Sequence, residues 1–134
     1  MAGKRRLGLA AVCAVICTGS AAADEAGTAE YLNSCASCHG ETGGGDGPLA
    51  DLMKVPVPPL TGLSAANDGK FPMLDVIHMI DGRQSRRGHG DPMPIWGNRF
   101  AAQANAEGVG VYGAEAIVRG RVLSIAYYLE SIQE

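Results

Sequence analysis

The sequence predicts an all-α domain in which a few helices and long loops wrap around a bound ligand. Apolar residues recur at helical spacing along the 134-residue chain, and no strand pattern is present beyond short runs such as Val55–Val57. Between residues 40 and 71 the chain is punctuated by glycine and proline, with Pro56, Pro58 and Pro59 close together. Such a long loop is unusual in a compact domain unless something else organises it, and a large flat cofactor would do so.

Two helices are expected in the first two thirds of the chain. Residues 26–38 form the first, because Ala29, Leu32 and Cys35 lie at helical spacing, with Tyr31 beside them. Residues 72–81 form a short second helix, begun by Pro72 in its first turn and ended by Gly82. Residues 83–99 are expected to be loop again.

The last helix is expected from Ala114 to Ile132. Its apolar residues share one face, as in an amphipathic helix packed on a core. That face consists of Ile117, Val118, Val122, Ile125, Tyr128, Leu129 and Ile132.

Residues 1–23 are expected to be a cleavable export signal, which leaves residues 24–134 as the domain. Lys4, Arg5 and Arg6 precede an apolar run of residues 7–17, and small residues ending in Ala23 follow. The apolar run is shorter than the about 20 residues that a bilayer span requires. An uncleaved N-terminal anchor is the alternative.

Removal of that segment makes the chain more acidic. It takes away three of the 11 basic residues and none of the 14 acidic ones, so the formal net charge falls from −3 to −6. This balance argues against nucleic acid or an anionic membrane as a partner.

Two of the four cysteines lie in the expected signal, so the domain keeps Cys35 and Cys38, followed directly by His39. Cys-x-x-Cys-His is the spacing of c-type haem attachment. Two thiols add to the two vinyl groups of the porphyrin, so they must lie about one helical turn apart. The histidine that follows then falls beneath the ring, where it can bind iron. This attachment takes place outside the cytoplasm, which the export signal indicates independently.

Three other interpretations compete with haem attachment. A thioredoxin-like pair would follow a strand, and here a helix precedes the motif. A zinc site would need further ligands, for which only His78 and His89 remain. A structural disulfide would explain the cysteines but not His39.

The chain resembles the monohaem cytochrome c family of bacterial periplasms. The resemblance runs from about Gly27 to the last helix and implies N- and C-terminal helices that cross beside one covalent haem c. One departure is the stretch of residues 98–113, which intervenes where the family's last helix usually begins. The motifs that carry the resemblance are Gly27 with Tyr31, residues 35–40, Gly45–Pro48 and Met93–Gly97.

An electron carrier needs iron coordinated on both sides, and Met93 is the expected partner of His39. Pro94 biases Met93 toward extended backbone, which suits a loop that presents a side chain inward. The resemblance also implies Met93, at the family's ligand position. His78 or an open iron site is the alternative. The other candidate side chains are Met53, Met73, Met79 and His89.

Three further residues are expected near the haem. His39 should donate its second ring N–H to a backbone carbonyl. The resemblance of Pro58–Gly62 to the family's Pro-x-Leu-x-Gly loop implies Pro58 as the acceptor, with Pro48 and Pro59 in competition. Trp96 is expected to pack in the haem cavity, and its indole N–H or His89 could reach a propionate.

The expected function is that of a soluble, monomeric periplasmic protein that carries single electrons between redox partners and is not an enzyme. The alternatives are a haem subunit of a larger complex, with residues 98–113 as its contact, and a gas- or peroxide-binding protein with an open iron site. Four basic residues near Met93 are either a solvated loop or a docking patch for an acidic partner. They are Arg83, Arg86, Arg87 and Arg99.

Overall fold

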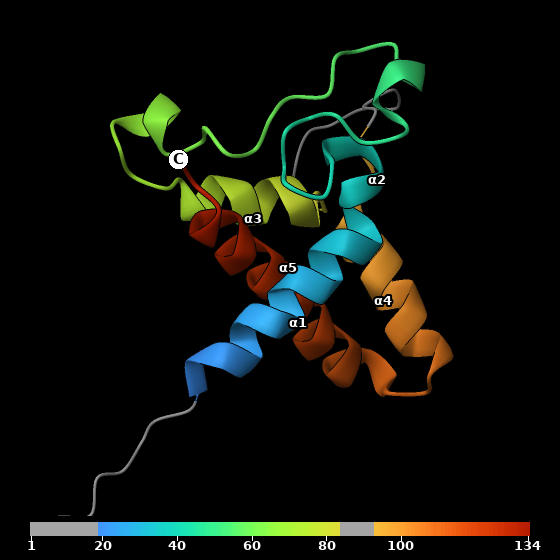
Figure 1. Cartoon of the computed structure of the whole chain (residues 1–134). Coiled ribbons are helices and arrows are strands. Elements are labelled where there is room, and N and C mark those ends of the chain that lie inside the picture. The colour runs from blue at the N-terminus through green and yellow to red at the C-terminus, as the bar shows by residue number, and fades with distance from the viewer. Residues whose placement is uncertain (1–18, 84–92) are drawn as a thin grey trace, which may run out of the picture.

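The computed structural model describes residues 19–83 and 93–134, which form α-helices and long loops without a strand (Figure 1). The expected all-α class is therefore confirmed. Two single 3₁₀ turns, Ala50–Leu52 and Ala65–Asn67, interrupt the long loop between the second and third helices. The α-helices are α1 (Gly19–Ser34), α2 (Ala36–His39), α3 (Met73–Asp81), α4 (Trp96–Ala106) and α5 (Gly110–Ser131).

Helices α1 and α5 cross and pack against each other, as the two helices in Figure 1 show. Gly27 of α1 permits this crossing, because a β-carbon there would lie 2.5 Å from the carbonyl oxygen of Ser124 in α5. One turn later, the buried ring of Tyr31 packs against Tyr128, with ring centroids 4.8 Å apart. The Tyr31 hydroxyl donates a hydrogen bond of 2.7 Å to the carbonyl oxygen of Gly40. The crossing therefore also fixes the chain beyond α2.

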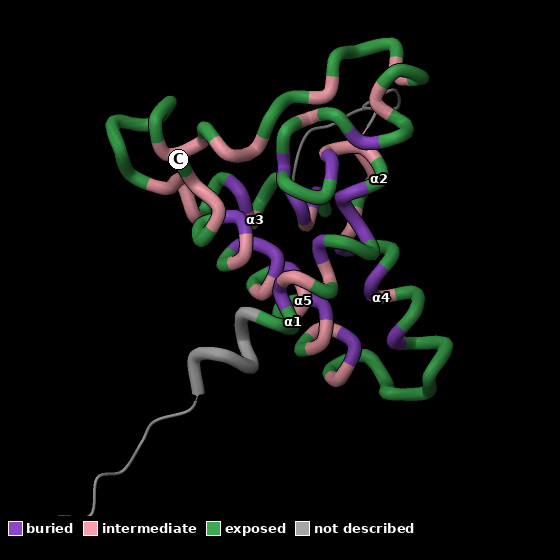
Figure 2. Tube along the Cα trace, in the orientation of Figure 1, coloured by how far each residue is buried: buried purple, intermediate pink, exposed green. Residues whose placement is uncertain are grey.

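The core lies along α5, whose buried positions recur every three or four residues (Figure 2). This spacing places them on one face of the helix, so the expected apolar face is confirmed in its central positions. Helices α1, α3 and α4 pack buried side chains onto that face. The buried positions of α5 are Ala114, Val118, Val122, Ile125, Ala126 and Leu129.

The structure corrects the expected inner face of the first helix. Ala29 and Leu32 are exposed, whereas Gly27, Tyr31 and Cys35 are buried. Small and aromatic residues form this interface because the backbones of α1 and α5 approach closely at Gly27.

The expectation of loop over residues 83–99 is wrong from Trp96 onward, where α4 begins. The stretch 98–113 is therefore mostly helix, and Phe100 and Ala104 pack its inner face into the core against α5. The last helix begins at Gly110, four residues before the expected Ala114. By contrast, the short helix expected at residues 72–81 is confirmed, and Gly82 ends it in a left-handed conformation with φ 67°.

Arg121 on α5 joins three helices. Its guanidinium pairs with Glu30 of α1 at 2.9 Å and bonds to Gln103 of α4 at 2.6 Å. It also lies 3.8 Å from the ring centroid of Phe100. This cluster stabilises the end of the bundle that α1, α4 and α5 share.

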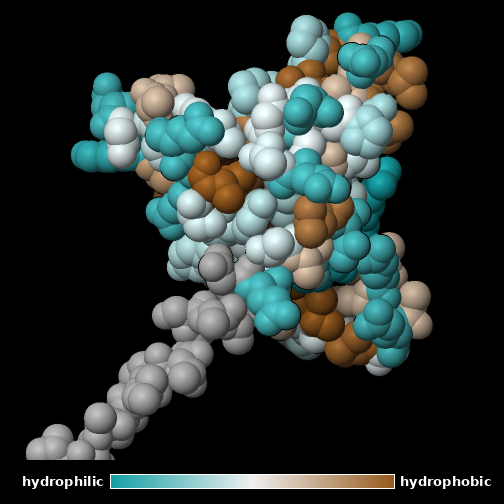
Figure 3. Space-filling view, viewed as in Figure 1, coloured by the Kyte–Doolittle hydropathy of each residue, from teal (hydrophilic) through white to brown (hydrophobic). Residues whose placement is uncertain are grey.

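Residues 1–18 of the expected export signal lie outside the described part of the chain. Among the helices that are described, none combines the length and apolar character that a membrane span requires. The face in Figure 3 is largely hydrophilic, with apolar side chains in separate patches.

Candidate cofactor site

A cavity of about 740 Å³ lies between α2, α3, α5 and the loop of residues 53–63, which we call the proline-containing loop. This volume falls within the roughly 300–1,000 Å³ typical of small-molecule and cofactor sites. Most of the residues around the cavity are apolar. All six residues expected at the cofactor line it: Cys35, Cys38, His39, Pro58, Met93 and Trp96.

The two thiols of the domain lie one helical turn apart at the edge of this cavity. Cys35 stands between α1 and the single turn of α2, and its carbonyl accepts hydrogen bonds from Cys38 N–H at 3.1 Å and His39 N–H at 2.9 Å. Both cysteines are free. Burial raises the pKa of the Cys35 thiol to about 12, and the nearby Glu30 and Cys38 add to the rise. A thioredoxin-like pair would show the opposite shift, because its reactive thiol has a lowered pKa.

Residues 40–49, the glycine-rich segment that follows Cys35–His39, fold back onto α2. A helix end leaves carbonyl groups without partners inside the helix, and this segment supplies the missing donors. The N–H of Gly45 bonds to His39 O at 2.8 Å, that of Gly47 to Cys38 O at 3.1 Å, and that of Leu49 to Ser37 O at 2.9 Å. Gly47 must be glycine, since a β-carbon there would lie 2.6 Å from the Ala36 carbonyl oxygen. The segment thereby fixes α2 and its histidine.

The imidazole of His39 is oriented by the proline-containing loop. Its Nδ1–H donates to the carbonyl oxygen of Pro58 over 3.1 Å, which leaves Nε2 as the lone-pair nitrogen. Burial lowers the pKa of His39 below its usual value, although the bond to Pro58 opposes that shift. A neutral imidazole with its second nitrogen held in this way is the form that binds a metal.

Three methionines, Met53, Met79 and Met93, line the same cavity, whereas Met73 packs against the core. His78 is exposed on α3 and is not among the lining residues. His89 lies outside the described residues. The cavity therefore brings His39 together with thioethers rather than with His78.

The first turn of α4 contributes Trp96 and Arg99 to the cavity. Trp96 packs against Phe100, with centroids 5.4 Å apart, and the Arg99 guanidinium lies 5.2 Å from the centre of the Trp96 ring. The sequence predicts for Arg99 either a solvated loop or a docking patch, whereas the structure places it on α4 at the cavity. Arg83 of that patch is paired with Asp81 and Glu115, and Arg86 and Arg87 lie outside the described residues.

The donor set suits a covalently attached haem. Two free thiols one turn apart, a neutral imidazole directly after them and an apolar cavity meet the requirements of the group. Within residues 19–83 and 93–134, no cluster of three or more His, Cys, Asp or Glu side chains is placed to hold a metal ion. The structure thus gives no support to the zinc alternative.

A helical fold around a Cys-x-x-Cys-His turn defines a c-type haem protein. Residues 25–107 match the cytochrome c family, and this region covers more than half of the chain. The chain therefore belongs to the cytochrome c family, binds haem c covalently through cysteines and functions in haem-based electron transfer. The match includes α4 and ends before α5. No curated protein and no solved structure matches the chain.

Proposed function

We propose that this cytochrome is a periplasmic carrier of single electrons and not an enzyme. Its haem is attached to Cys35 and Cys38 and ligated by His39 and Met93. The observation that carries the proposal is the cavity itself, which is lined by both the oriented imidazole of His39 and the thioether of Met93. When bound, the haem supplies the one-electron redox chemistry, and the protein supplies ligands, orientation and a dry surrounding.

Met93 is the best candidate among the three methionines at the cavity. Met79 is 48% exposed on helix α3, whereas Met93 is partly buried against the core. Met93 precedes Pro94, which restricts its backbone, and stands three residues before Trp96 at the start of α4. It is thus attached to a packed helix at one end, which favours a fixed position for its thioether.

The residues around the site act together to set the reduction potential. A thioether favours ferrous iron, so Met93 raises the potential. The hydrogen bond from His39 to Pro58 makes the imidazole a stronger donor and works in the opposite direction. Most residues of the cavity lining are apolar, which lowers the polarity around the haem and favours the form of lower charge.

A periplasmic location and redox-protein partners are part of the proposal. The location is supported by the signal-like residues 4–23, and the acidic net charge argues for protein partners over nucleic acid. Leu49, Val55 and Met79 line the cavity and are also 43–54% exposed. The haem would cover part of these side chains, and we expect the monomer to dock a partner at the apolar rim that remains. Figure 3 shows apolar side chains at the upper right, over the segment that contains Ala50–Leu52.

Spectra of the haem-loaded protein with and without carbon monoxide test the proposal. We expect a low-spin haem that does not bind carbon monoxide when reduced, and a weak near-red sulfur-to-iron band when oxidised. Met93→Ala should abolish the band, admit carbon monoxide and lower the potential. Met53→Ala and Met79→Ala are the matched controls and should retain the band. Ready binding of carbon monoxide by the unaltered protein would contradict an electron carrier and favour a gas-binding protein.

A further inference from the structure

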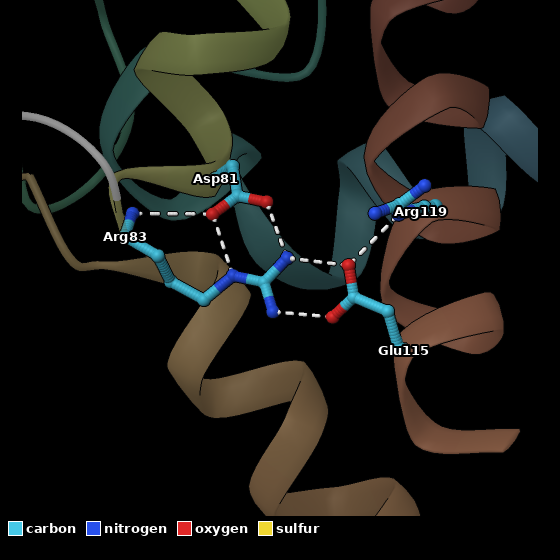
Figure 4. A network of polar contacts seen from close by, with 4 residues as sticks. All are labelled: Asp81, Arg83, Glu115 and Arg119. Carbon is cyan, nitrogen blue, oxygen red and sulfur yellow. Dashed lines mark hydrogen bonds and ion pairs between the residues drawn. The ribbon is translucent and has the colours of Figure 1, made fainter. Parts of the chain in front are cut away.

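Arg83 joins the end of α3 to α5 through a dense set of polar contacts, drawn in Figure 4. Its Nε and one terminal nitrogen bond to the two carboxylate oxygens of Asp81, each over 2.7 Å. The other terminal nitrogen pairs with Glu115 of α5 over 2.6 Å. Its backbone N–H also bonds to Asp81, over 3.1 Å. We call Asp81, Arg83 and Glu115 the Arg83 bridge.

This bridge lies where the chain before Met93 and the chain after it meet. A β-carbon on Gly82 would lie 3.3 Å from the Ile95 side chain, so residues 82 and 95 are in contact. A β-carbon on Gly97 would lie 2.5 Å from Asp81 Oδ1 and 2.6 Å from Arg83 Nε. The start of α4 is thus pressed directly onto the bridge. Met93 stands only two residues before Ile95, close to this junction.

The geometry of the Arg83 bridge makes it stronger than a typical surface ion pair. Isolated exposed pairs contribute little, but a forked arginine that bonds two carboxylates in a network is an exception. The side chains of Arg83 and Asp81 are 27% and 21% exposed, and that of Glu115 is 38% exposed. Arg119 bonds to Glu115 as well, but it is 77% exposed and lies on the same helix, so it joins no second element.

We propose that Arg83 is a positioning residue that holds the Met93 thioether at the haem iron by fixing the start of α4 against the end of α3. The inference rests on the proposed ligation of iron by Met93. Arg83 itself does not line the cavity, so it acts through the backbone between Ile95 and Gly97.

A thioether is a weak ligand of ferric iron, so the lifetime of its bond depends on how firmly the protein holds it. Release of Met93 requires its segment to move relative to the cavity wall formed by α3. Because Ile95 and Gly97 pack on residues 81–83, that movement has to break the Arg83 bridge or slide past it. The bridge therefore raises the barrier to loss of the ligand.

The haem-loaded ferric protein tests this with imidazole as a competing ligand. Loss of the near-red sulfur band after mixing reports the rate at which Met93 leaves the iron. We expect Arg83→Gln to increase this rate about tenfold, which corresponds to about 1.4 kcal/mol. Glu115→Gln, which preserves shape, should act in the same direction, whereas Arg119→Gln should stay within about twofold of the unaltered protein.

Arg121→Gln is the matched control for general loss of stability. It removes another partly buried arginine of α5, which pairs with Glu30 of α1 and bonds to Gln103 toward the far end of α4, away from the Arg83 bridge. Its urea midpoint should fall, with little change in the imidazole rate. Equal acceleration by Arg83→Gln and Arg121→Gln, or no acceleration by Arg83→Gln, would overturn the inference. Failure of Met93→Ala to remove the band would instead refute the ligation on which the inference rests.

Discussion

The carbonyl oxygen of Pro58 lies 3.1 Å from Nδ1 of His39, although 19 residues separate them in the sequence. The glycine-rich segment brings them together. Gly45 bonds to the carbonyl of His39 and also touches the loop, since a β-carbon there would lie 2.7 Å from the Val57 carbonyl oxygen. The N–H of Leu60 bonds to Gly43 O at 2.7 Å and holds the loop in place. Gly43 and Gly45, which the sequence places in an irregular loop, thus help to orient the imidazole of His39.

Gly45→Ala should raise the reduction potential. The added methyl group would displace the loop at Val57 and Pro58, and Gly45 has φ 82°, which strains any other residue. A weaker bond to Pro58 makes His39 a poorer donor and favours ferrous iron, by a shift on the order of tens of millivolts. Potentiometric titration measures the shift. Gly62→Ala, on the same loop with nothing within 4 Å, is the control and should leave the potential unchanged.

Tyr31→Phe should reduce the free energy of unfolding by about 1–3 kcal/mol, because the buried carbonyl of Gly40 would lose its hydrogen bond. Burial raises the pKa of Tyr31 above its usual value, so the hydroxyl remains a donor in alkaline solution. Urea unfolding of the haem-loaded protein provides the measurement. Tyr127→Phe alters a tyrosine that is 53% exposed and should change stability by less than about 0.5 kcal/mol. Similar losses in both variants would argue against the role of the Gly40 bond.

The parts predicted from sequence are those with a strong local signal. Helix α5 has a regular apolar face, and Gly82 is a clear helix end, so both were found. Cys35, Cys38 and His39 have a spacing that few other sites share. The cavity brings together Pro58 and Met93, which the resemblance implies, and Trp96, which is expected to pack there, although haem ligation by Met93 stays a prediction.

Helix α4 was missed because its sequence carries a weak signal. The helix contains one large buried side chain, Phe100, and its other buried positions are Gly97 and Ala104. Glycine is a poor helix former, so local propensity argues against a helix start at Gly97. Tertiary packing outweighs propensity here, because only glycine fits against the Arg83 bridge. The Arg83 bridge could not be predicted from a local pattern, because Arg83 and Glu115 are 32 residues apart in the sequence.

Phe100→Ala should reduce the free energy of unfolding by about 3–5 kcal/mol, because its side chain is 1% exposed and the change leaves a cavity. Urea or thermal unfolding checks this. Tyr112→Ala removes an aromatic ring that is 94% exposed at the start of α5 and should change stability by less than about 0.5 kcal/mol. A small effect of Phe100→Ala would mean that residues 98–106 contribute little to the hydrophobic core.

The stability that the Arg83 bridge provides should be lost in acid. Hydrogen bonding from Arg83 lowers the pKa of Asp81 below its usual value, and Arg83 and Arg119 do the same for Glu115. A carboxylate with a lowered pKa stabilises the fold above its unfolded-state pKa, near 4. That contribution disappears as the pH falls through the folded-state value. The free energy of unfolding in urea should therefore be greater for the unaltered protein than for Asp81→Asn at neutral pH, by about 1 kcal/mol or less, and the two values should converge in acid. A constant gap at all pH values would contradict this account.

Covalent attachment at Cys35 and Cys38 is tested most directly by mass spectrometry of the protein matured with haem. After denaturation and extraction in acidic organic solvent, we expect one haem to remain on the chain, on the peptide that contains Cys35–His39. The double variant Cys35→Ser, Cys38→Ser should release all haem under the same conditions. Complete extraction of haem from the unaltered protein, or retention by the double variant, would contradict the central claim.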